Sequence, residues 1–326
     1  MERIPKHPPS IKPVPANTVR PTWSVMIPVY NCSSYLREAI ISVLDQDFGE
    51  KEMQIEVVDD ASTDADVKMI VDEVGYGRVT YFRQPYNVGS LRNFETCIQR
   101  ANGYLVHLLH GDDRVRIGYY QKIGELFKKF PEAGAAFTNN SAIDSLGNFY
   151  GTAGELMGKD GILQNWLNTI AQMQRLQYVA ITVKRNVYEK LGSFYAVTYG
   201  EDWEMWVRIA KNYPTAYSPE VLADYRLHFN SISGGAYKKG KNIEDLSCVI
   251  KLIHKQISEA DQVLISKTAK QKTAYHAIEF AKQFIWPGTR NKKIVLWQVF
   301  QILKLYRDKH LFIQCFRLVY SVLRWK

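Results

Sequence analysis

The 326-residue sequence contains no apolar run that reaches the roughly 18 unbroken residues of a membrane-spanning helix. Its first residues are rich in charge and proline and have no apolar core, so they do not resemble a secretory signal. Only four cysteines are present, and they lie far apart, without the close spacing of a zinc site. Widely spaced thiols are typical of reduced proteins. These absences predict a protein that works in the cytoplasm.

The sequence lacks the motifs of two classes of protein, the dinucleotide-dependent dehydrogenases and the nucleic-acid-binding proteins. The first predicted strand-to-helix turn, residues 28–34 (PVYNCSS), has no glycine fingerprint, which argues against a dinucleotide-dependent dehydrogenase. No zinc spacing, helix-turn-helix pattern or RNP-like strand supports a nucleic-acid partner. The net charge of +9 nevertheless favours anionic partners, such as phosphates or an acidic membrane surface. Acidic residues almost vanish from the C-terminal part of the chain, so much of the excess positive charge lies there.

The first half of the chain alternates short β-favouring runs with helical patterns of about a dozen residues. Strands are predicted at residues 23–28, 55–58, 78–82, 104–109, 135–138 and 178–183. Helices are predicted from Ser33 or Ser34, from near Asp64, from residues 87–89, over residues 203–211, and from about residue 242 onward. Residues 148–158 have a loop-like composition. Such alternation predicts an α/β fold with a mostly parallel sheet flanked by helices.

Composition divides the chain into three parts. Residues 1–21 are rich in proline and predict a flexible lead-in. Residues 22–240 carry the strand–helix alternation and are predicted to form one α/β domain. Residues 241–326 predict a basic, amphipathic helical region at the C-terminus.

Polar clusters follow three predicted strands, at residues 28–31 (PVYN), Asp59–Asp60 and Asp112–Asp113. The carboxyl ends of parallel strands share one edge of a sheet, and ligands bind outside that edge. Adjacent carboxylates repel each other unless a cation intervenes, and magnesium or manganese beside a diphosphate is such a cation. A solvated turn after Leu109 and a helix-capping loop after Asp60 remain the alternatives.

Two further segments have candidate chemistry. Asp202 lies between Glu201 and Trp203, and a carboxylate beside apolar rings has the raised proton affinity of a general base. Helix capping by Asp202 is the alternative. Residues 225–235 form a basic, glycine-containing segment in which Arg226, His228 and loop amides could neutralise a diphosphate, unless the segment is an ordinary surface loop.

Taken together, six runs resemble the family 2 glycosyltransferases, which have the GT-A fold. The runs are IPVYN (27–31), VVDDASTD (57–64), NVGSLRN (87–93), ANGYLVHLLHGDD (101–113), GEDWEMWVRIA (200–210) and YRLHFNSIS (225–233). They occur in the family's order and cover roughly two thirds of the chain, from residue 23 to residue 233. The resemblance implies an inverting glycosyltransferase that depends on a divalent metal, Mn or Mg. The donor would be a nucleotide-diphosphate sugar, usually a UDP-sugar.

Residue by residue, the resemblance assigns the nucleotide site and the reacting groups. It implies a nucleotide pocket of Pro28, Val29 and Tyr30, a base contact at Asp60 with Asp59 close by, and Asn87 and Arg92 near the nucleotide or organising its loops. It implies further that Asp112 touches the ribose or donor sugar, that Asp113 ligates the metal, that Asp202 is the catalytic base, and that His228 is a metal or diphosphate contact.

The sequence departs from the family pattern in two places. Many relatives carry an acidic residue two positions before the Asp pair, where this chain has His110. Processive synthases of the family carry membrane helices and a Q-x-x-R-W motif after the base. Here Gln172 and Arg175 have that spacing, but Leu176 replaces the Trp and all three precede Asp202. We therefore expect transfer of a single sugar.

The C-terminal region leaves two interpretations open. Apolar residues of 294–303 and 311–323 are interleaved with basic residues that include Lys293, Arg317 and Lys326. Such helices either form a cap packed on the protein or a partner, or dock on the inner, anionic face of the cell membrane, where a lipid-linked acceptor would be presented. The leading hypothesis is an enzyme of cell-surface polysaccharide or glycolipid biosynthesis that acts on a glycan or lipid-linked acceptor. The alternative is a non-catalytic nucleotide-sugar or glycan-binding module on the same fold.

Overall fold

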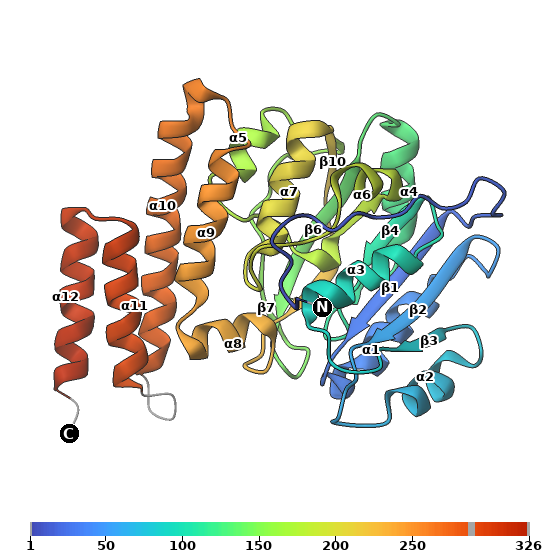
Figure 1. Ribbon diagram of the computed structural model, residues 1–326, viewed down its shortest axis with the longest axis horizontal. Coiled ribbons are helices and arrows are strands. Elements are labelled where there is room, and N and C mark those ends of the chain that lie inside the picture. Colours follow the sequence, from blue (N-terminus) through green and yellow to red (C-terminus); the bar gives the residue numbers. More distant parts are fainter. Residues whose placement is uncertain (1, 286–290, 325–326) are drawn as a thin grey trace. The chain divides into compact units, whose positions relative to one another are not determined.

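The computed structural model describes residues 2–285 and 291–324 (Figure 1). Met1 of the predicted lead-in, and residues 286–290 and 325–326 of the predicted C-terminal region, Lys326 among them, lie outside the described residues. The chain divides into two compact units. The first contains residues up to 166, 175–196 and 212–227, and the second contains residues 167–174, 197–211 and 228–326. The predicted domains, residues 22–240 and 241–326, are continuous segments chosen by composition. The two observed units each combine segments that are distant in sequence.

A ten-stranded sheet forms the centre of the first unit. The strands are β1 (Trp23–Val29), β2 (Met53–Asp59), β3 (Thr80–Arg83), β4 (Leu105–Leu108), β5 (Arg114–Val115), β6 (Ala135–Ile143), β7 (Phe149–Thr152), β8 (Gly161–Ile162), β9 (Ile181–Lys184) and β10 (Thr215–Arg226). Their order is β3-β2-β1-β4-β9-β6-β10-β5, with β7 paired to β6 and β8 to β10. Strands β1 to β4 are parallel neighbours, as are β6 and β10, whereas β9 runs antiparallel to β4 and β6. The predicted mostly parallel sheet is confirmed.

The apolar sequence of β1 explains its central position. All seven of its residues are buried, because helices cover both faces of a parallel sheet and leave no solvent-facing row. Val25, Ile27 and Val29 belong to a core cluster that also contains Ile55 and Val57 of β2. Figure 1 shows β1, β2 and β4 side by side, and their carboxyl ends point the same way because the three strands are parallel.

Helices of the first unit connect these strands. They are α1 (Ser33–Leu44), α2 (Val67–Gly75), α3 (Ser90–Arg100), α4 (Tyr119–Lys129), α6 (Arg185–Leu191) and the 3-10 helix η1 (Tyr178–Ala180). The helix predicted from Ser33 or Ser34 begins at Ser33, but neither serine is its capping residue. The capping position is Cys32, whose side chain makes no capping hydrogen bond, and the Ser33 N–H donates to the Asp64 carboxylate at 2.9 Å instead. A carboxylate from the next strand-to-helix loop therefore does the capping.

Two further predictions need correction. The loop-like segment 148–158 contains strand β7, which pairs antiparallel with β6. The strand predicted at 178–183 begins as the 3-10 helix η1 and becomes strand β9 only at Ile181. In both places the pairing partner lies elsewhere in the sheet, so local composition could not reveal it.

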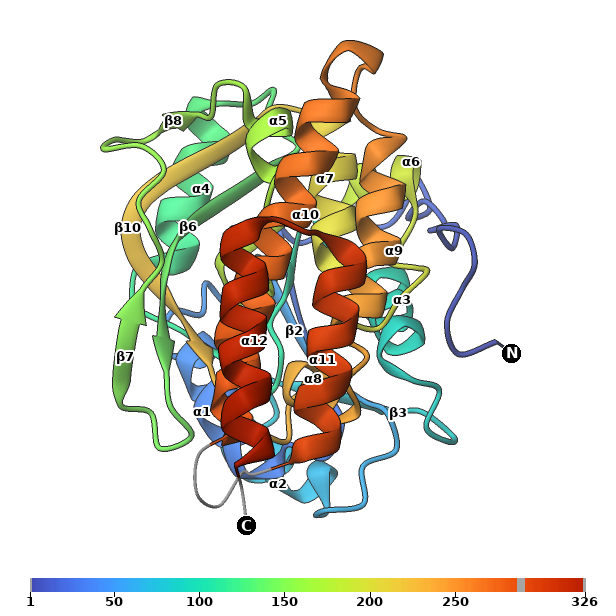
Figure 2. The ribbon, with the colours of Figure 1, turned by 90° about the vertical axis from the view of Figure 1, so that its left-hand side faces the viewer.

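The second unit is helical. Helices α5 (Trp166–Ile170) and α7 (Glu201–Asn212) lie mostly in it, together with α8 (Ile232–Lys239), α9 (Asn242–His254), α10 (Glu259–Ala281), η2 (Lys282–Ile285), α11 (Lys292–Leu305) and α12 (Lys309–Leu323). Buried residues of α10, α11 and α12, such as Ala277, Val295 and Leu318, share one core cluster. Helices α11 and α12 lie side by side in both views (Figure 2). Within the described residues, no helix combines the length and the apolar character needed to cross a bilayer.

Residues 2–12, part of the predicted flexible lead-in, have no regular secondary structure but are bonded along their length. The Pro5 and Pro9 carbonyls accept hydrogen bonds from the backbone N–H groups of Ala196 and Ser193, at 2.8 and 2.9 Å. Ile11 is buried, and the side-chain amide of Gln99 bonds the Ser10 carbonyl at 2.8 Å. Proline removes a donor but keeps its carbonyl, so a proline-rich segment can still be bonded along a surface. We call residues 2–12 the N-terminal strap.

Candidate active site

The ends of β1, β2 and β4 form one rim of the sheet, and all three polar clusters lie there. The Asp60 N–H donates to the Val29 carbonyl at 2.8 Å, which joins the ends of β2 and β1. The Gly111 N–H donates to the Pro28 carbonyl at 3.2 Å, which joins the turn after β4 to β1. Pro28 and Val29 are buried, whereas Tyr30 is half exposed at the tip. The rim therefore offers backbone from three strand ends and the ring of Tyr30 to a ligand.

The two aspartates at the end of β2 have different partners. Asp59 is fully buried, and its carboxylate accepts from the Ser62 N–H and the Tyr81 hydroxyl, both at 2.8 Å, and pairs with Arg83. These bonds hold the turn after β2 and leave Asp59 no exposed oxygen. Asp59 thus stabilises the turn at the end of β2. That it lies close to the nucleotide base stays a prediction.

Asp60 is bound to the loop that follows β3. Its carboxylate accepts from the backbone N–H groups of Val88 and Gly89, at 2.6 and 2.9 Å, and from the Asn87 side-chain amide at 2.9 Å. Burial raises the pKa of Asp60 above its usual range, and the two backbone bonds oppose that rise. Asp60 and Asn87, which the family resemblance places near the nucleotide, are therefore in direct contact.

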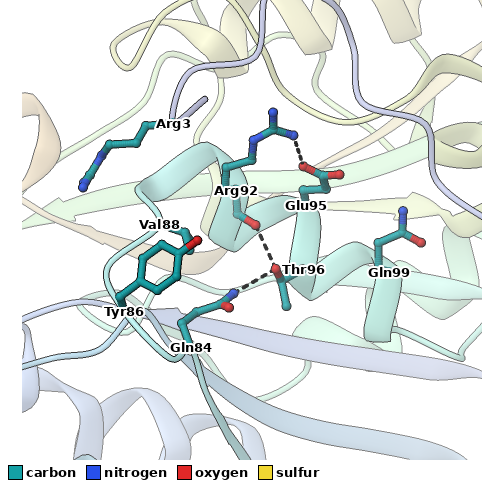
Figure 3. Close-up of a pocket in the computed structure, with 8 residues that line it drawn as sticks. All are labelled: Arg3, Gln84, Tyr86, Val88, Arg92, Glu95, Thr96 and Gln99. Carbon is teal, nitrogen blue, oxygen red and sulfur yellow. Dashed lines mark hydrogen bonds and ion pairs between the residues drawn. The ribbon is translucent and has the colours of Figure 1, made fainter. Parts of the chain in front are cut away.

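Arg92 lies on α3, in the wall of a pocket of about 240 Å³ (Figure 3). Its guanidinium donates to Glu95 at 2.7 Å and to the Glu2 carbonyl of the N-terminal strap at 2.8 Å. The pocket is lined by Arg3, Gln84, Tyr86, Val88, Arg92, Glu95, Thr96 and Gln99. Arg92 therefore joins the strap to α3, and its role near the nucleotide stays a prediction.

A possible metal-binding group lies in the turn after β4. Ligand atoms of His110, Asp112 and Asp113 all lie within 4.8 Å of one another. Burial and the neighbouring charge of Asp112 both raise the pKa of Asp113 well above its usual range. Two adjacent carboxylates with such a penalty are stabilised by a cation, and carboxylate oxygens with an imidazole nitrogen suit a divalent metal. The residues present therefore fit the metal that the sequence implied.

His110, which stands where relatives carry an acid, is held by aromatic rings. It stacks on Phe94, with ring centroids 5.0 Å apart, and packs against the tilted ring of Tyr178, with centroids 4.3 Å apart. Its buried Nε2 has no hydrogen-bond partner among the described residues. Burial lowers the pKa of His110, so the imidazole is neutral at neutral pH, which is the form that binds metals. Aromatic packing and burial thus keep a neutral ring beside the Asp pair.

The structure corrects the expected role of Arg226. This residue is fully buried and faces the protein rather than an open diphosphate site. Its backbone N–H donates to Asp113 Oδ1 at 2.8 Å, and its guanidinium donates to the Asp112 carbonyl at 2.8 Å and to Glu38 at 2.7 Å. Arg226 therefore braces the Asp pair from the end of β10. The sequence showed a basic residue here but no sign of its partners.

Replacing Arg226 with Met should keep the apolar volume and the backbone N–H bond to Asp113, but remove the guanidinium bonds to the Asp112 carbonyl and Glu38. We expect the free energy of unfolding in urea to fall by about 2 kcal/mol, since the carbonyl of Asp112 would be left without its donor. Metal-dependent nucleotide binding should weaken with it. Arg37→Met, at an exposed ion pair with Glu73, is the control and should leave the unfolding transition unchanged. Equal unfolding curves for Arg226→Met and wild type would show that the Arg226 side chain does not stabilise the turn that carries Asp112 and Asp113.

Asp202 lies in the first turn of α7, in the second unit. Its carboxylate accepts from the Trp203 N–H at 2.7 Å and from the side-chain amide of Gln174. Trp203 and Trp206, beside it in sequence, are buried. Burial raises the pKa of Asp202 to about 6, although both hydrogen bonds lower it. A carboxylate with this pKa is ionised at neutral pH and still basic enough to take a proton.

The sequence did not single out Gln174. It pointed to Gln172 and Arg175 by their motif spacing, but the Gln172 side chain accepts from Lys272 at 3.1 Å. Gln174 is the residue that bonds Asp202, from the short segment after α5. Because α5 and α7 are about thirty residues apart in sequence, only the packing of the unit reveals the pair.

The predicted basic loop around His228 is partly helical. Ser231 caps α8 by accepting the Gly234 N–H at 3.0 Å, and both its N–H and its hydroxyl donate to the His228 carbonyl. His228 belongs to the second unit, and its role as a metal or diphosphate contact stays a prediction. The segment 231–235 is thus a helix start rather than an open glycine loop.

The sequence model of the family described as "Glycosyl transferase family 2" matches residues 24–190, just over half of the chain. The chain belongs to glycosyl transferase family 2. This confirms the predicted family, and with it the prediction of a glycosyltransferase. The match includes the three strand ends of the rim and the His110, Asp112 and Asp113 group.

Named relatives cover more of the chain. It is 28% identical over 228 residues to a Campylobacter jejuni GalNAc(5)-diNAcBac-PP-undecaprenol beta-1,3-glucosyltransferase, covering 68% of this chain and 71% of that one. It is 29% identical over 230 residues to the putative teichuronic acid biosynthesis glycosyltransferase TuaG of Bacillus subtilis, covering 68% and 85%. A match to an uncharacterised Mycobacterium tuberculosis protein, 33% identical, spans only 38% of each chain.

Solved structures share the fold over nearly the whole chain. The S. aureus TarS 1-349 structure in complex with UDP-GlcNAc aligns with a TM-score of 0.65 at 14% identity, over 92% of this chain and 89% of that one. The mannosyltransferase PcManGT from Pyrobaculum calidifontis, in complex with GDP-Man and Mn2+, aligns with a TM-score of 0.53 at 15% identity, over 93% and 92%. The predicted GT-A fold with a helical C-terminal region is confirmed.

Proposed function

We propose that this protein is an inverting glycosyltransferase that moves a single sugar from a nucleotide-diphosphate sugar, a UDP-sugar, to an acceptor hydroxyl. The observation that carries the proposal is the group of His110, Asp112 and Asp113 at the carboxyl ends of the parallel strands. In such sheets ligands bind outside that edge. Two solved structures of the same fold, with UDP-GlcNAc and with GDP-Man and Mn2+, support a nucleotide-sugar donor.

The donor half of the reaction depends on residues of the first unit. Pro28, Val29 and Tyr30 line the nucleotide site, and Asp60 with Asn87 receives the base. Asp113, with Asp112 and His110, holds a divalent ion, Mn or Mg, while Arg226 fixes the Asp pair. A divalent ion bound there would stabilise the negative charge that develops on the leaving diphosphate. His228 remains a candidate contact to the metal or diphosphate.

The acceptor half depends on Asp202. Ionised above its pKa of about 6, it takes the proton of the acceptor hydroxyl. Gln174 fixes the orientation of the carboxylate by donating to it. The acceptor oxygen then attacks the anomeric carbon opposite the leaving group, which inverts that centre in one step. Since Leu176 breaks the motif of processive synthases, one sugar is added per encounter.

The acceptor class follows from the named relatives and from the C-terminal helices. One relative's name includes an undecaprenol-linked saccharide and another's includes teichuronic acid biosynthesis. We infer a glycan or lipid-linked acceptor, in cell-surface polysaccharide or glycolipid biosynthesis on the cytoplasmic face of the membrane. Helices α11 and α12 would then bring the enzyme to that surface.

A tail face on these two helices supports peripheral membrane contact. Eight apolar side chains there are at least 40% exposed: Leu296, Trp297, Phe300, Phe312, Ile313, Phe316, Tyr320 and Leu323. Exposed basic residues accompany them: Lys292, Lys293, Lys304, Arg307, Lys309, Arg317 and Arg324. Asp308 is the one acid in residues 291–324, and its carboxylate caps α12. Apolar and basic side chains together suit an anionic bilayer.

Vesicle sedimentation tests the tail face. We expect binding to phosphatidylglycerol vesicles but not to phosphatidylcholine vesicles, and at least about ten-fold weaker binding for the double variant Phe312→Ser/Phe316→Ser. Val263→Ser/Leu264→Ser, at exposed apolar residues of α10, is the matched control and should bind as wild type does. Equal losses in both variants, or a dimer in light scattering that only the Phe variant dissociates, would contradict membrane docking.

Calorimetric titration of the wild-type protein with UDP, with and without Mn2+, tests the donor site. Binding in the micromolar range that requires Mn2+ is the expected result. Absence of binding to UDP, and then to GDP and dTDP under the same conditions, would overturn the proposed function.

A further inference from the structure

The start of the N-terminal strap contacts the loop that follows β3. Arg3 donates from Nη1 to the Asn87 carbonyl at 3.1 Å and from Nη2 to the Asn87 side-chain oxygen. The adjacent Glu2 carbonyl accepts from Arg92 Nε at 2.8 Å. The strap thus binds Asn87 and Arg92, which the family resemblance places near the nucleotide. Figure 3 shows Arg3 and Arg92 in the wall of the same pocket.

Asn87 connects Arg3 to Asp60. Its side-chain oxygen faces Arg3, and its Nδ2 donates both to the Asp60 carboxylate at 2.9 Å and to the Asp60 carbonyl at 3.2 Å. An arginine has only donors, so it bonds the oxygen of an amide and not its nitrogen. Arg3 therefore fixes which end of the amide faces Asp60. Without it, the amide is free to rotate and to remove a donor from the carboxylate.

The strap is anchored on both sides of this contact. Arg3 lies over Gly89, whose φ is +94°, and a Cβ at Gly89 would lie 3.3 Å from Arg3 Nε. Two residues further on, buried Pro5 accepts the Ala196 N–H at 2.8 Å. Burial raises the pKa of Asp60, and the charge of Arg3 works in the opposite direction. The geometry and the charge both favour an ionised Asp60 bound to a fixed loop.

We propose that Arg3 is a positioning residue of the donor site, which acts through Asn87 to hold Asp60 and the loop 87–89 ready for the nucleoside part of a nucleoside diphosphate. The inference rests on the proposed function, because it takes Asp60 as a nucleotide contact. On this inference, the N-terminal strap contributes a residue to the donor site, although it precedes the first strand of the sheet in sequence.

The test is calorimetric UDP binding with Mn2+ for wild type, Arg3→Ala, Asn87→Ala and the double variant. Loss of one hydrogen-bonded connection predicts a roughly two- to ten-fold rise in the UDP dissociation constant for Arg3→Ala. The melting temperature should stay unchanged, since Arg3 is exposed. In the Asn87→Ala background, Arg3→Ala should have a smaller effect, because the side-chain connection to Asp60 is gone and only the bond to the residue 87 carbonyl and the charge of Arg3 remain.

Lys6→Ala is the matched control. Lys6 is a strap residue of the same charge, and its ion pair with Glu2, at 3.7 Å, is exposed. Unchanged UDP affinity in Lys6→Ala supports a specific role for Arg3. An unchanged affinity in Arg3→Ala, or an equal loss with and without Asn87, would overturn the inference while leaving the proposed function intact. A wild-type protein that binds no nucleotide would remove the proposed function itself.

Discussion

Replacing Asp202 with Asn should lower kcat for sugar transfer by about 100- to 10,000-fold, the range expected when a general base is removed. The amide cannot accept the acceptor's proton, but it keeps the shape of the carboxylate and its bond from the Trp203 N–H. UDP affinity should stay unchanged, because Asp202 is not among the proposed donor contacts. Steady-state transfer rates and UDP titrations on the same variant separate the two effects.

The pH dependence of wild-type turnover gives a second measurement of the same group. With a pKa of about 6 in the folded protein, Asp202 is ionised above that pH, so kcat/KM should rise through pH 6 and level off above it. The raised pKa also means that the ionised carboxylate destabilises the fold as pH rises from 4 to 7. Asp202→Asn should therefore be more stable than wild type at pH 7.

Glu259→Gln is a suitable control, since Glu259 is an exposed acid in the first turn of α10 in the same unit. It should leave turnover and its pH profile unchanged. Full activity in Asp202→Asn would exclude the base role. If wild type binds UDP but transfers no sugar to any acceptor, the non-catalytic nucleotide-sugar module becomes the better description.

Replacing Asp113 with Asn should abolish metal-dependent UDP binding. The asparagine oxygen can still accept the Arg226 N–H, so the turn keeps its brace while the carboxylate charge is lost. Altering a residue that only supports a metal ligand costs about 10- to 100-fold in affinity, and a ligand itself should cost at least as much. Titration with UDP at fixed Mn2+, together with direct Mn2+ titration, measures both losses.

Chelation provides the control for Asp113→Asn. Wild type with excess EDTA should bind UDP as weakly as the variant does in the presence of Mn2+. Asp64→Asn, whose side chain bonds the Ser33 N–H elsewhere on the rim, should keep the metal dependence. Mn2+-dependent UDP binding by Asp113→Asn at wild-type affinity would rule out Asp113 as a ligand.

The strand ends were predictable because two local signals coincide there. Apolar runs such as residues 23–28 identify buried parallel strands. Carboxylates close after such runs, such as Asp60 and Asp113, are unfavourable in the ionised form unless a cation or hydrogen bonds stabilise them. The rule that parallel strands present their carboxyl ends at one edge then brings these acids together. Fold class and the rim followed from this reasoning, and the resemblance to the family supplied the chemistry.

The supporting residues could not be predicted in the same way. Arg226, Gln174 and Arg3 each act on a residue far away in the sequence, at separations of 113, 28 and 84 residues. Their neighbours in sequence gave misleading signals: glycines and a histidine beside Arg226, a motif-like spacing beside Gln174, and prolines beside Arg3. Such partners are set by tertiary packing, which local composition does not encode.

The brace between Arg226 and the Asp pair also has a consequence for biosynthesis. Asp113 leaves the ribosome 113 residues before Arg226, a delay on the order of ten seconds at usual elongation rates. During that interval β10 is missing from the sheet, so the Asp113 carboxylate and the Asp112 carbonyl both lack their donors from Arg226. On the proposed function, donor binding is acquired only once about two thirds of the protein has been made, so an unfinished chain would not compete with finished enzyme for nucleotide sugars.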